Sequence, residues 1–404
     1  MIRLHNTLTK QLDFLPNVGI LNGALRVYAC GVTPYDHCHI GHARSYITWD
    51  VLRRWLEFRG RPVKYVQNFT DIDDKIIERA RQEHLTCDQI ADRYIASYFE
   101  DFDWLNVRRA DEYPRVTKYF WAMAGWVNEM LVKGLAYEVP DGVRFNGQNF
   151  KNYGQLSGHT TCEDFYIWKN KPEEKKMFVG GRPGWHTECA VFIKELLGGS
   201  VDIHCGGHDL IFPHHENEIA ISESLFGTPL ASMWLHNGFV ENRGQKMSKS
   251  EGNAIYLRDL RAETIDPNML RFWILQAHYR QPLDQYGFHQ CYLQWRSLRN
   301  KLLNAPEGCV TKGFIEALDD DLNTPLALAE LHKEPSQQMA TLLGFKVQHY
   351  EVPADIRELA ARRAALRDEK KWAEADAVRD EIVAQGWQVQ DSNFEGRASV
   401  YVTR

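Results

Sequence analysis

The chain has 404 residues, of which 44% are hydrophobic and 12% aromatic, so it can bury a large core and is predicted to form about two to four domains. This composition excludes an intrinsically disordered chain. The 48 basic and 54 acidic residues give a net charge of −6 at pH 7. The overall charge of the protein therefore cannot attract polyanions such as nucleic acids. Any nucleic-acid partner must therefore meet a local basic surface.

The amino terminus and the cysteines predict a cytoplasmic protein with no membrane association. Residues 1–6 lack the cationic, apolar and small-residue regions of a signal peptide, and no run of about 18 apolar residues occurs. The eight cysteines are scattered without Cys-x-x-Cys spacing, which argues against a disulfide framework. We expect most of them to be reduced and buried.

Strand and helix patterns alternate from the start of the chain. Residues 25–30 form a short apolar run, and a helical pattern covers residues 40–60. A second strand is predicted at residues 63–69, and another helical stretch follows it. This order predicts an α/β fold with a Rossmann-like parallel sheet, whose ligands lie at the carboxyl ends of the strands.

The same alternation resumes after an interruption. Residues 115–135 predict an amphipathic helix, and residues 136–183 predict an irregular, glycine-rich insertion. A strand at 201–204 and a helix at 216–226 follow. We therefore expect both halves to contribute to one sheet.

Beyond residue 266 the chain becomes rich in helix. From residue 353 a helical hairpin is predicted at 356–370 and 372–385, followed by strands at 387–390 and 399–403.

A His-Ile-Gly-His peptide at residues 39–42 follows the first strand and opens a helix. Two imidazoles, with a glycine between them that permits close approach, suit a polyphosphate at the helix N-terminus, where the dipole favours negative charge. On these four residues alone, a capped and solvated turn is the more common interpretation.

A Lys-Met-Ser-Lys-Ser peptide at residues 246–250 precedes a glycine. Two lysines beside small hydroxyl residues can close over a triphosphate and offset charge that develops on the leaving pyrophosphate. A solvated lysine loop is an equally good interpretation of this peptide alone.

Four residues offer ligands for a metal ion. Cys30 ends the first strand, Cys189 follows the Trp-His-Thr-Glu peptide, and His214 and Glu218 share one helical face at i and i+4. Thiolate, imidazole and carboxylate are ligands that zinc accepts. Spacing alone favours the alternative of two buried structural thiols and an exposed helical pair.

The two signature peptides together make the chain resemble class I aminoacyl-tRNA synthetases. The resemblance narrows to the cysteinyl-tRNA synthetase family through NFTDIDDKI at 68–76, GWHTEC at 184–189, DLIFPHHENE at 209–218, HNGFV at 236–240 and DDDLNTP at 319–325. AEADAVRDEIVAQG at 373–386 resembles the family's carboxyl-terminal module, so the resemblance covers nearly the whole chain.

The resemblance implies ATP-dependent ligation of L-cysteine to tRNA(Cys) through a cysteinyl-adenylate, with Mg²⁺ accompanying ATP. It also implies a monomer with one zinc ion per subunit, bound by Cys30, Cys189, His214 and Glu218, that recognises the substrate thiolate. A pocket that recognises only size discriminates poorly between cysteine and serine. A zinc ion can discriminate between them, because it binds the soft thiolate of cysteine more strongly than the hydroxyl of serine.

The resemblance also assigns roles to other residues. His39 and His42 would contact the ATP phosphates and act in catalysis, together with Lys246 and Lys249. Lys249 would also bind ATP. The ribose would lie against Gly207 and Asp209, although a plain turn aspartate remains an alternative. The cysteine pocket would be lined by Gly31, Thr33, Thr70 and Trp185, although Trp185 could equally be a core aromatic residue.

Two departures leave the acceptor open. Val32 stands where the family usually has proline, and Pro34 follows two residues later, which is similar to the mycothiol-pathway ligase, a relative that gives cysteine to an amino sugar. The region 331–350 also lacks about a helix, which shortens the helical bundle. The alternatives are therefore a cysteine-adenylating ligase with a non-tRNA amine acceptor and a non-catalytic tRNA-binding paralogue. The intact signature peptides argue against the latter.

The resemblance and the patterns together predict five segments. They are the first half of a catalytic Rossmann-like domain at 1–120, a connective insertion at 121–184, the second catalytic half with the lysine loop at 185–265, a shortened helical bundle at 266–350, and a carboxyl-terminal module similar to anticodon-binding modules at 351–404.

Overall fold

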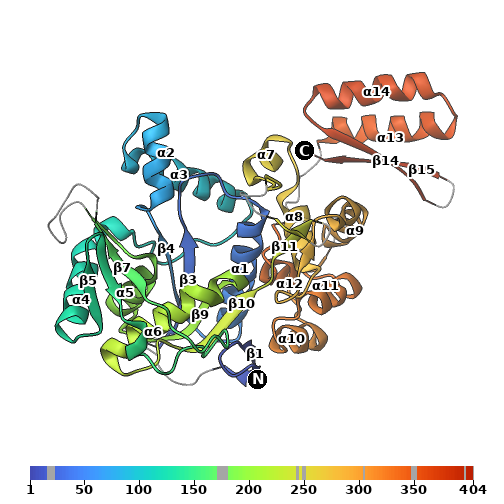
Figure 1. Ribbon diagram of the computed structural model, residues 1–404. Coiled ribbons are helices and arrows are strands. Elements are labelled where there is room, and N and C mark those ends of the chain that lie inside the picture. The colour runs from blue at the N-terminus through green and yellow to red at the C-terminus, as the bar shows by residue number, and fades with distance from the viewer. Residues whose placement is uncertain are drawn as a thin grey trace. The chain divides into compact units, whose positions relative to one another are not determined.

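Two compact units make up the molecule, Met1–Lys346 and Val347–Arg404, and each is described by itself. In this computed structural model the described residues are 1–15, 23–170, 181–242, 245–247, 252–303, 305–346, 353–394 and 397–403. Figure 1 labels their helices and strands. Within these ranges, no helix is both long and apolar enough to cross a membrane.

A four-stranded parallel sheet lies at the centre of the Met1–Lys346 unit (Figure 1). Its order is β10-β9-β3-β4, and its strands are β3 Leu25–Val32, β4 Val63–Phe69, β9 Val201–Gly207 and β10 Ala231–Asn237. Their nearly continuous burial is typical of parallel strands covered on both faces. The predicted α/β fold is confirmed, and so is the prediction that both halves share one sheet.

Helices connect these strands and cover them. They are α1 Ile40–Phe58, α2 Asp74–Glu83, α3 Cys87–Trp104, α5 Trp185–Leu197 and α6 Glu216–Phe226. Along β3, Tyr28 and Cys30 pack in one hydrophobic cluster with residues of α5 and α6. Because side chains alternate along a strand, Cys30 faces α5 and α6 at the carboxyl end of the sheet.

The segment 136–183 contains a four-stranded antiparallel sheet, so the prediction of an irregular insertion is wrong. Its order is β5-β6-β7-β8, with β5 Ala136–Val139, β6 Gly142–Phe145, β7 Phe165–Lys169 and β8 Arg182–Pro183. Three of the glycines that suggested a loop, Gly142, Gly147 and Gly154, lie where the backbone of another residue approaches closely. A Cβ at Gly142 would lie 2.1 Å from the carbonyl oxygen of Trp168 on the next strand.

The remaining strands of this unit are short, whereas its remaining helices range from 6 to 16 residues. The strands are β1 Arg3–Asn6, β2 Gln11–Phe14, β11 Val240–Asn242, β12 Gln245–Lys246 and β13 Leu283–Asp284. The helices are α4 Phe120–Val132, α7 Leu257–Ala262, α8 Pro267–Leu275, α9 Gly287–Leu302, α10 Lys312–Asp319, α11 Thr324–Lys333 and α12 Gln337–Leu342. Single turns are η1 Val116–Lys118, η2 Gly147–Asn149, η3 His208–Leu210 and η4 Ile211–His215. The chain is rich in helix beyond residue 266, as predicted.

The Val347–Arg404 unit has a core of its own. The helical hairpin is α13 Ala354–Asp368 and α14 Trp372–Ala384, and the antiparallel strands β14 Gln388–Phe394 and β15 Arg397–Thr403 follow it. Its buried cluster consists of Ile356, Val378, Ile382 and Trp387. The predicted hairpin and both strands are confirmed, although the strands are longer than predicted.

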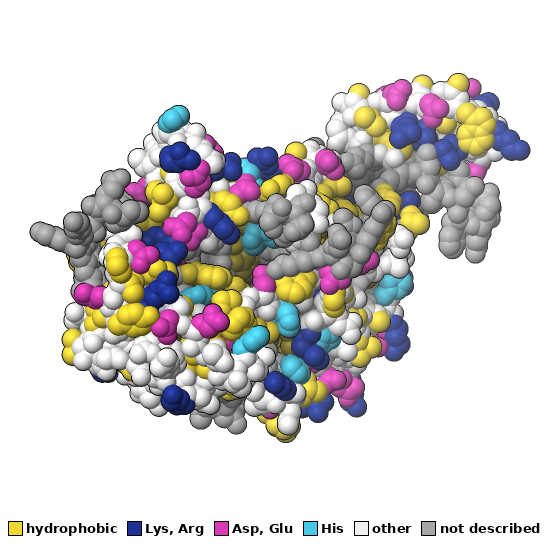
Figure 2. Space-filling model, in the orientation of Figure 1, with side chains coloured by type: hydrophobic (Ala, Val, Ile, Leu, Met, Phe, Trp, Pro, Cys, Tyr) yellow, Lys and Arg dark blue, Asp and Glu magenta, His cyan; other side chains and the backbone are white. Residues whose placement is uncertain are grey.

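Charges of both signs are interspersed on the visible face of the Met1–Lys346 unit (Figure 2). This pattern agrees with the small net charge of −6. Bulk attraction of a polyanion to this face is therefore not expected.

Candidate functional site

The turn at residues 39–42 caps the N-terminus of α1. His39 Nδ1 accepts a hydrogen bond from the Gly41 N–H, and His42 Nδ1 accepts one from the His39 N–H, each at 3.1 Å. The two rings stack with their centroids 3.9 Å apart. A Cβ at Gly41 would lie 2.8 Å from His39 Cε1, so this arrangement requires glycine. Both imidazoles are therefore held at the positive end of the helix dipole.

Both flanks of the lysine loop lie beside this turn. Met247 is buried, and its Cε is 3.7 Å from the position that a Cβ on Gly41 would take. On the other side of the loop, the Ile40 N–H donates a hydrogen bond to the carbonyl oxygen of Ile255 (3.0 Å). The two signature peptides, about two hundred residues apart in sequence, therefore meet at the N-terminus of α1.

The structure describes only some of the other residues that were predicted to bind ATP. Lys249 and the side chain of Lys246 lie outside the described residues. Gly207 is the last residue of β9, and Asp209 is exposed in the turn that follows, at the carboxyl edge of the sheet. A Cβ at Gly207 would lie 2.6 Å from Asp209 Oδ1, so glycine permits the position of this carboxylate.

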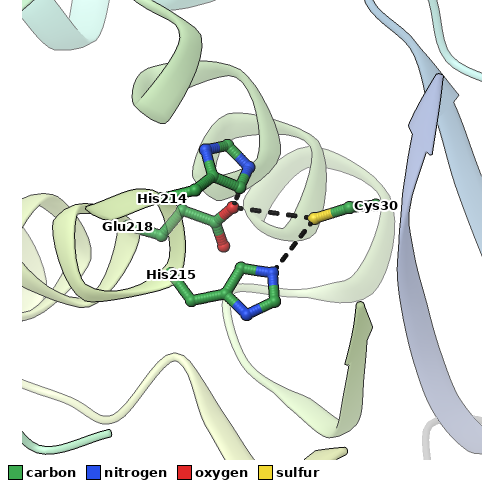
Figure 3. Close-up of side chains that lie close together, drawn as sticks. All are labelled: Cys30, His214, His215 and Glu218. Atoms are coloured by element: carbon green, nitrogen blue, oxygen red, sulfur yellow. Dashed lines mark hydrogen bonds and ion pairs between the residues drawn. The ribbon is translucent and has the colours of Figure 1, made fainter. Parts of the chain in front are cut away.

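A buried group of metal-ligand side chains lies at the same edge of the sheet. Cys30, His214, His215 and Glu218 each offer one donor atom, and these atoms all lie within 4.8 Å of one another (Figure 3). Cys189 contacts two of these residues, with Sγ 3.9 Å from Cys30 Sγ and 3.5 Å from His214 Nε2, and we count it as part of the same donor cluster. The structure thus brings together all four predicted ligands and adds His215 as a fifth.

The burial of this donor cluster excludes the exposed helical pair that spacing alone favoured, whereas the two thiols are buried as that alternative expected. His214 is 1% exposed and Glu218 is 0% exposed, so they are not a solvated helical pair. They form an ion pair, with His214 Nε2 2.7 Å from Glu218 Oε1.

Burial and the ion pair set the charges in the donor cluster. Burial raises the pKa of Cys30 to about 11, and it raises the pKa of Cys189 well above its ordinary value. Burial opposes a charge on His214, but Glu218 outweighs it and raises the pKa of His214 to about 10. The cluster therefore holds protonated thiols beside an imidazolium–carboxylate pair, and a divalent cation would displace those protons.

Further histidines orient the donors. Glu218 Oε2 lies 2.8 Å from His204 Nε2, and His215 Nδ1 lies 2.8 Å from His236 Nε2. His186 Nδ1 is 3.0 Å from His214 Nδ1. Such outer partners fix the orientation of ligands in metal sites.

Sequence reasoning missed these histidines and also His215. The signal was present in the peptide DLIFPHHENE, where His215 follows His214 directly. Neighbouring residues of a regular α-helix point about 100° apart. Here the chain kinks at Phe212, whose backbone is extended (φ −134°, ψ 133°), and both histidine rings that follow the kink are buried.

Three of the residues predicted to line a cysteine pocket, Gly31, Thr70 and Trp185, lie beside the donor cluster or its neighbours. Trp185 stacks on His214, with ring centroids 4.1 Å apart and planes at 16°, and it is 40% exposed, so it is not a core aromatic residue. The Gly31 N–H donates a hydrogen bond to Asn68 Oδ1 (2.8 Å). No hydrogen bond among the described residues joins Thr33 to the other three.

Thr70 contacts Glu188, a residue that was not predicted from the sequence to belong to the site. Its hydroxyl donates to Glu188 Oε2 (2.7 Å), and both side chains are buried. Burial raises the pKa of Glu188 to about 8. Glu188 immediately precedes Cys189, so Thr70 is tied to the helix that carries a predicted ligand.

The family whose model matches residues 17–292 is described as "tRNA synthetases class I (C) catalytic domain", and a DALR domain matches residues 313–334. The chain is 39% identical to the cysteine--tRNA ligase of Rippkaea orientalis, with 95% of this chain and 96% of that protein covered. It is 40% identical to the cysteine--tRNA ligase of Synechococcus elongatus at the same coverage. The first match spans 469 positions, more than the 404 residues of this chain, so that relative holds segments that this chain lacks.

Solved structures support the fold. The methionyl-tRNA synthetase of Mycobacterium tuberculosis in complex with methionyl-adenylate matches with a TM-score of 0.59 at 16% identity. The match covers 88% of this chain and 87% of that chain. At this identity the likeness shows a shared class I synthetase fold.

Proposed function

The chain belongs to the class I tRNA synthetase family of the cysteine type, and on that basis we propose that it joins L-cysteine to tRNA(Cys) through a cysteinyl-adenylate formed from ATP. The observation that carries the proposal is the buried donor cluster, which lies at the same sheet edge as the His39–His42 turn. One arrangement suits a thiol, and the other suits a polyphosphate.

Cys30, Cys189, His214 and Glu218 are the residues that would hold one zinc ion per subunit. Their donor types fit zinc, and the neighbouring His215 and His204 could hold two of them in place. When bound, zinc supplies a soft Lewis acid that favours a thiolate over a serine hydroxyl.

The described residues suggest how the chain positions its substrates. The His39 and His42 imidazoles, at the N-terminus of α1, would bind the ATP phosphates and stabilise charge as pyrophosphate leaves. Lys246 and Lys249 would add positive charge there, and Asp209 beside Gly207 would receive the ribose. Mg²⁺ would accompany ATP as part of the substrate.

Cysteine would lie between the donor cluster and Trp185, with Gly31, Thr33 and Thr70 near its backbone groups. Because Trp185 stacks on His214, it can orient that ligand while it covers the substrate. No protein nucleophile is required, since the cysteine carboxylate itself attacks the α-phosphorus and rate comes from positioning.

For the acceptor we propose tRNA, which would meet the Val347–Arg404 unit. That unit folds around its own core, and the match to the Rippkaea orientalis cysteine--tRNA ligase covers 95% of this chain, so it includes most of the unit. A small-amine acceptor is the second candidate, because this chain lacks segments that the Rippkaea orientalis relative holds.

The experiment that tests this function supplies ATP, labelled cysteine and total tRNA to the purified protein. We expect charging of tRNA with cysteine and not with serine. Cysteine-dependent ATP–pyrophosphate exchange without charged tRNA would favour the small-amine acceptor. No exchange at all would contradict the proposal.

A further inference from the structure

A buried carboxylate on α3 faces the helix that follows the lysine loop. Asp101 is 0% exposed, and neither of its carboxylate oxygens has a hydrogen-bond partner among the residues that the structure describes. Arg261 of α7 faces it, with Nη1 3.6 Å from Asp101 Oδ1. A buried carboxylate without hydrogen bonds is costly, so its place in the interior calls for an explanation beyond helix packing.

Arg261 is shared between two acidic residues of α3. Its Nη2 donates a hydrogen bond to Glu100 Oε2 (2.8 Å), but the Glu100 side chain is 62% exposed. An exposed ion pair of this kind contributes little, whereas a buried carboxylate interacts strongly with the cation that faces it. Asp101 is therefore the acidic residue through which α3 can hold α7.

Helix α7 is joined to the catalytic turn by backbone hydrogen bonds. The Leu257 N–H, at the start of α7, donates to the carbonyl oxygen of Cys38 (2.9 Å), immediately before His39. Helix α3 reaches the same segment from another side, since Ser97 Oγ and His37 Nδ1 are 2.7 Å apart. Helix α3 therefore contacts both the segment just before His39 and helix α7, which follows the lysine loop.

We propose that Asp101 is a positioning residue for the ATP reaction. In its ionised form it holds Arg261 and α7, and through α7 it holds the backbone that pairs with the His39 turn in the arrangement that binds ATP. Among the described residues, the oppositely charged side chain closest to Asp101 is that of Arg261, so we assign the effect of Asp101 to this contact. The inference rests on the proposed function, because it concerns the binding of ATP.

The charge on Asp101 changes near neutral pH. Burial raises its pKa to about 7, Arg261 and Arg258 oppose the rise, and Glu100 and Asp259 add to it. If ATP binding requires the ionised form, ATP binding and proton release are linked. The KM for ATP should then fall as the pH rises through about 7, and it should rise below that pH, where the carboxyl is protonated.

The test measures cysteine-dependent ATP–pyrophosphate exchange from about pH 6 to about pH 8.5, with kcat and the KM for ATP determined separately. In Asp101→Asn, which preserves the side-chain volume, we expect the KM for ATP to rise about three- to tenfold at the alkaline end. We also expect its dependence on pH near 7 to disappear. Arg261→Gln should raise the KM for ATP in the same way, and it tests the contact from the less buried partner.

Glu100→Gln is the matched control, because it removes the exposed partner of the same arginine. We expect its KM for ATP to stay within about twofold of the wild type. The pH midpoint should move to lower pH, because Glu100 raises the pKa of Asp101.

The outcomes separate the two proposals. A wild-type protein without exchange overturns the proposed function, and this inference with it. Normal exchange in the wild type, with the same KM and the same pH dependence in Asp101→Asn and Arg261→Gln, overturns only the role of Asp101. An equal rise in the KM for cysteine would indicate a general structural loss and would also overturn it.

Discussion

The donor cluster and the His39–His42 turn lie at one edge of the sheet but are built in opposite ways. The donor cluster gathers buried side chains from β3, α5, η4 and α6, which are up to 188 residues apart in the chain. The turn consists of four consecutive residues that cap one helix. In the proposed function, selection of the amino acid would therefore depend on distant, desolvated side chains, whereas phosphate binding would depend on the local geometry of one helix cap.

This difference predicts different consequences of substitution. A substitution in the donor cluster removes one buried donor atom whose position other side chains fix. We therefore expect the protein to lose its metal ion and its preference for cysteine. A change in the turn leaves the sheet and its core intact, so we expect loss of rate with ATP while the fold is retained. The following substitutions test the comparison.

The largest effect is expected at Cys30. In Cys30→Ser a poor zinc ligand replaces a thiol, so the zinc content should fall well below one per chain. Changing a residue that only orients a metal ligand typically lowers metal affinity or activity by about 10–100-fold. Because Cys30 is itself a proposed ligand, activity with cysteine should fall by more than this. Preference for cysteine over serine should also decrease. Elemental analysis and exchange assays with both amino acids measure these effects.

Cys291→Ser is the matched control for this substitution. Cys291 is a buried thiol on α9 that is not part of the donor cluster, so metal content and selection should not change. If both serine variants keep their zinc and their selectivity, the donor cluster has no role in recognising the thiol.

A smaller effect is expected at His39. Asparagine is a good N-cap residue, so His39→Asn keeps the start of α1 while it removes the imidazole. The kcat of ATP–pyrophosphate exchange should fall by about 10²–10³-fold, as is typical when one group that stabilises transition-state charge is lost. The free energy of unfolding should change by less than about 0.5 kcal/mol. A fully active variant would indicate that capping is the only role of His39.

The sequence predicted the turn better than the donor cluster, for a physical reason. Consecutive residues determine a helix cap, so the peptide at 39–42 carries its own geometry. Burial of a side chain depends on segments far away in the chain. Cys30, Cys189, His214 and Glu218 were therefore proposed through a family resemblance, and spacing alone favoured the wrong environment for His214 and Glu218.

Three other features could not be predicted from local patterns. His215 was missed because the chain kinks at Phe212, just before His214 and His215, and such a kink has no periodicity that a sequence pattern could show. Asp101 lies in an amphipathic helix, where an aspartate is normally solvated, but in the structure it is buried and Arg261 of α7 lies against it. The antiparallel sheet in the insertion was missed because strands of four or five residues give a weak alternating signal.

The smallest effect on activity is expected for Gly41→Ala. This substitution distinguishes the effect of the helix cap on activity from its effect on the stability of the fold. The new Cβ would lie 2.8 Å from the ring of His39, so the ring must turn and the cap is lost, at a cost of about 1 kcal/mol. Alanine also favours a helix interior by about 1 kcal/mol over glycine, so the free energy of unfolding should change little. Exchange activity should nevertheless fall by about tenfold, because both imidazoles lose their fixed orientation.

Gly125→Ala on α4 provides the comparison. A Cβ there meets nothing within 4 Å, so we expect about 0.5–1 kcal/mol of added stability and unchanged activity. Denaturant titration and exchange assays of both variants measure the difference. If Gly41→Ala gained the same stability and kept its activity, the close approach of the His39 ring would have no function, and the contrast between the turn and the donor cluster would lose its basis.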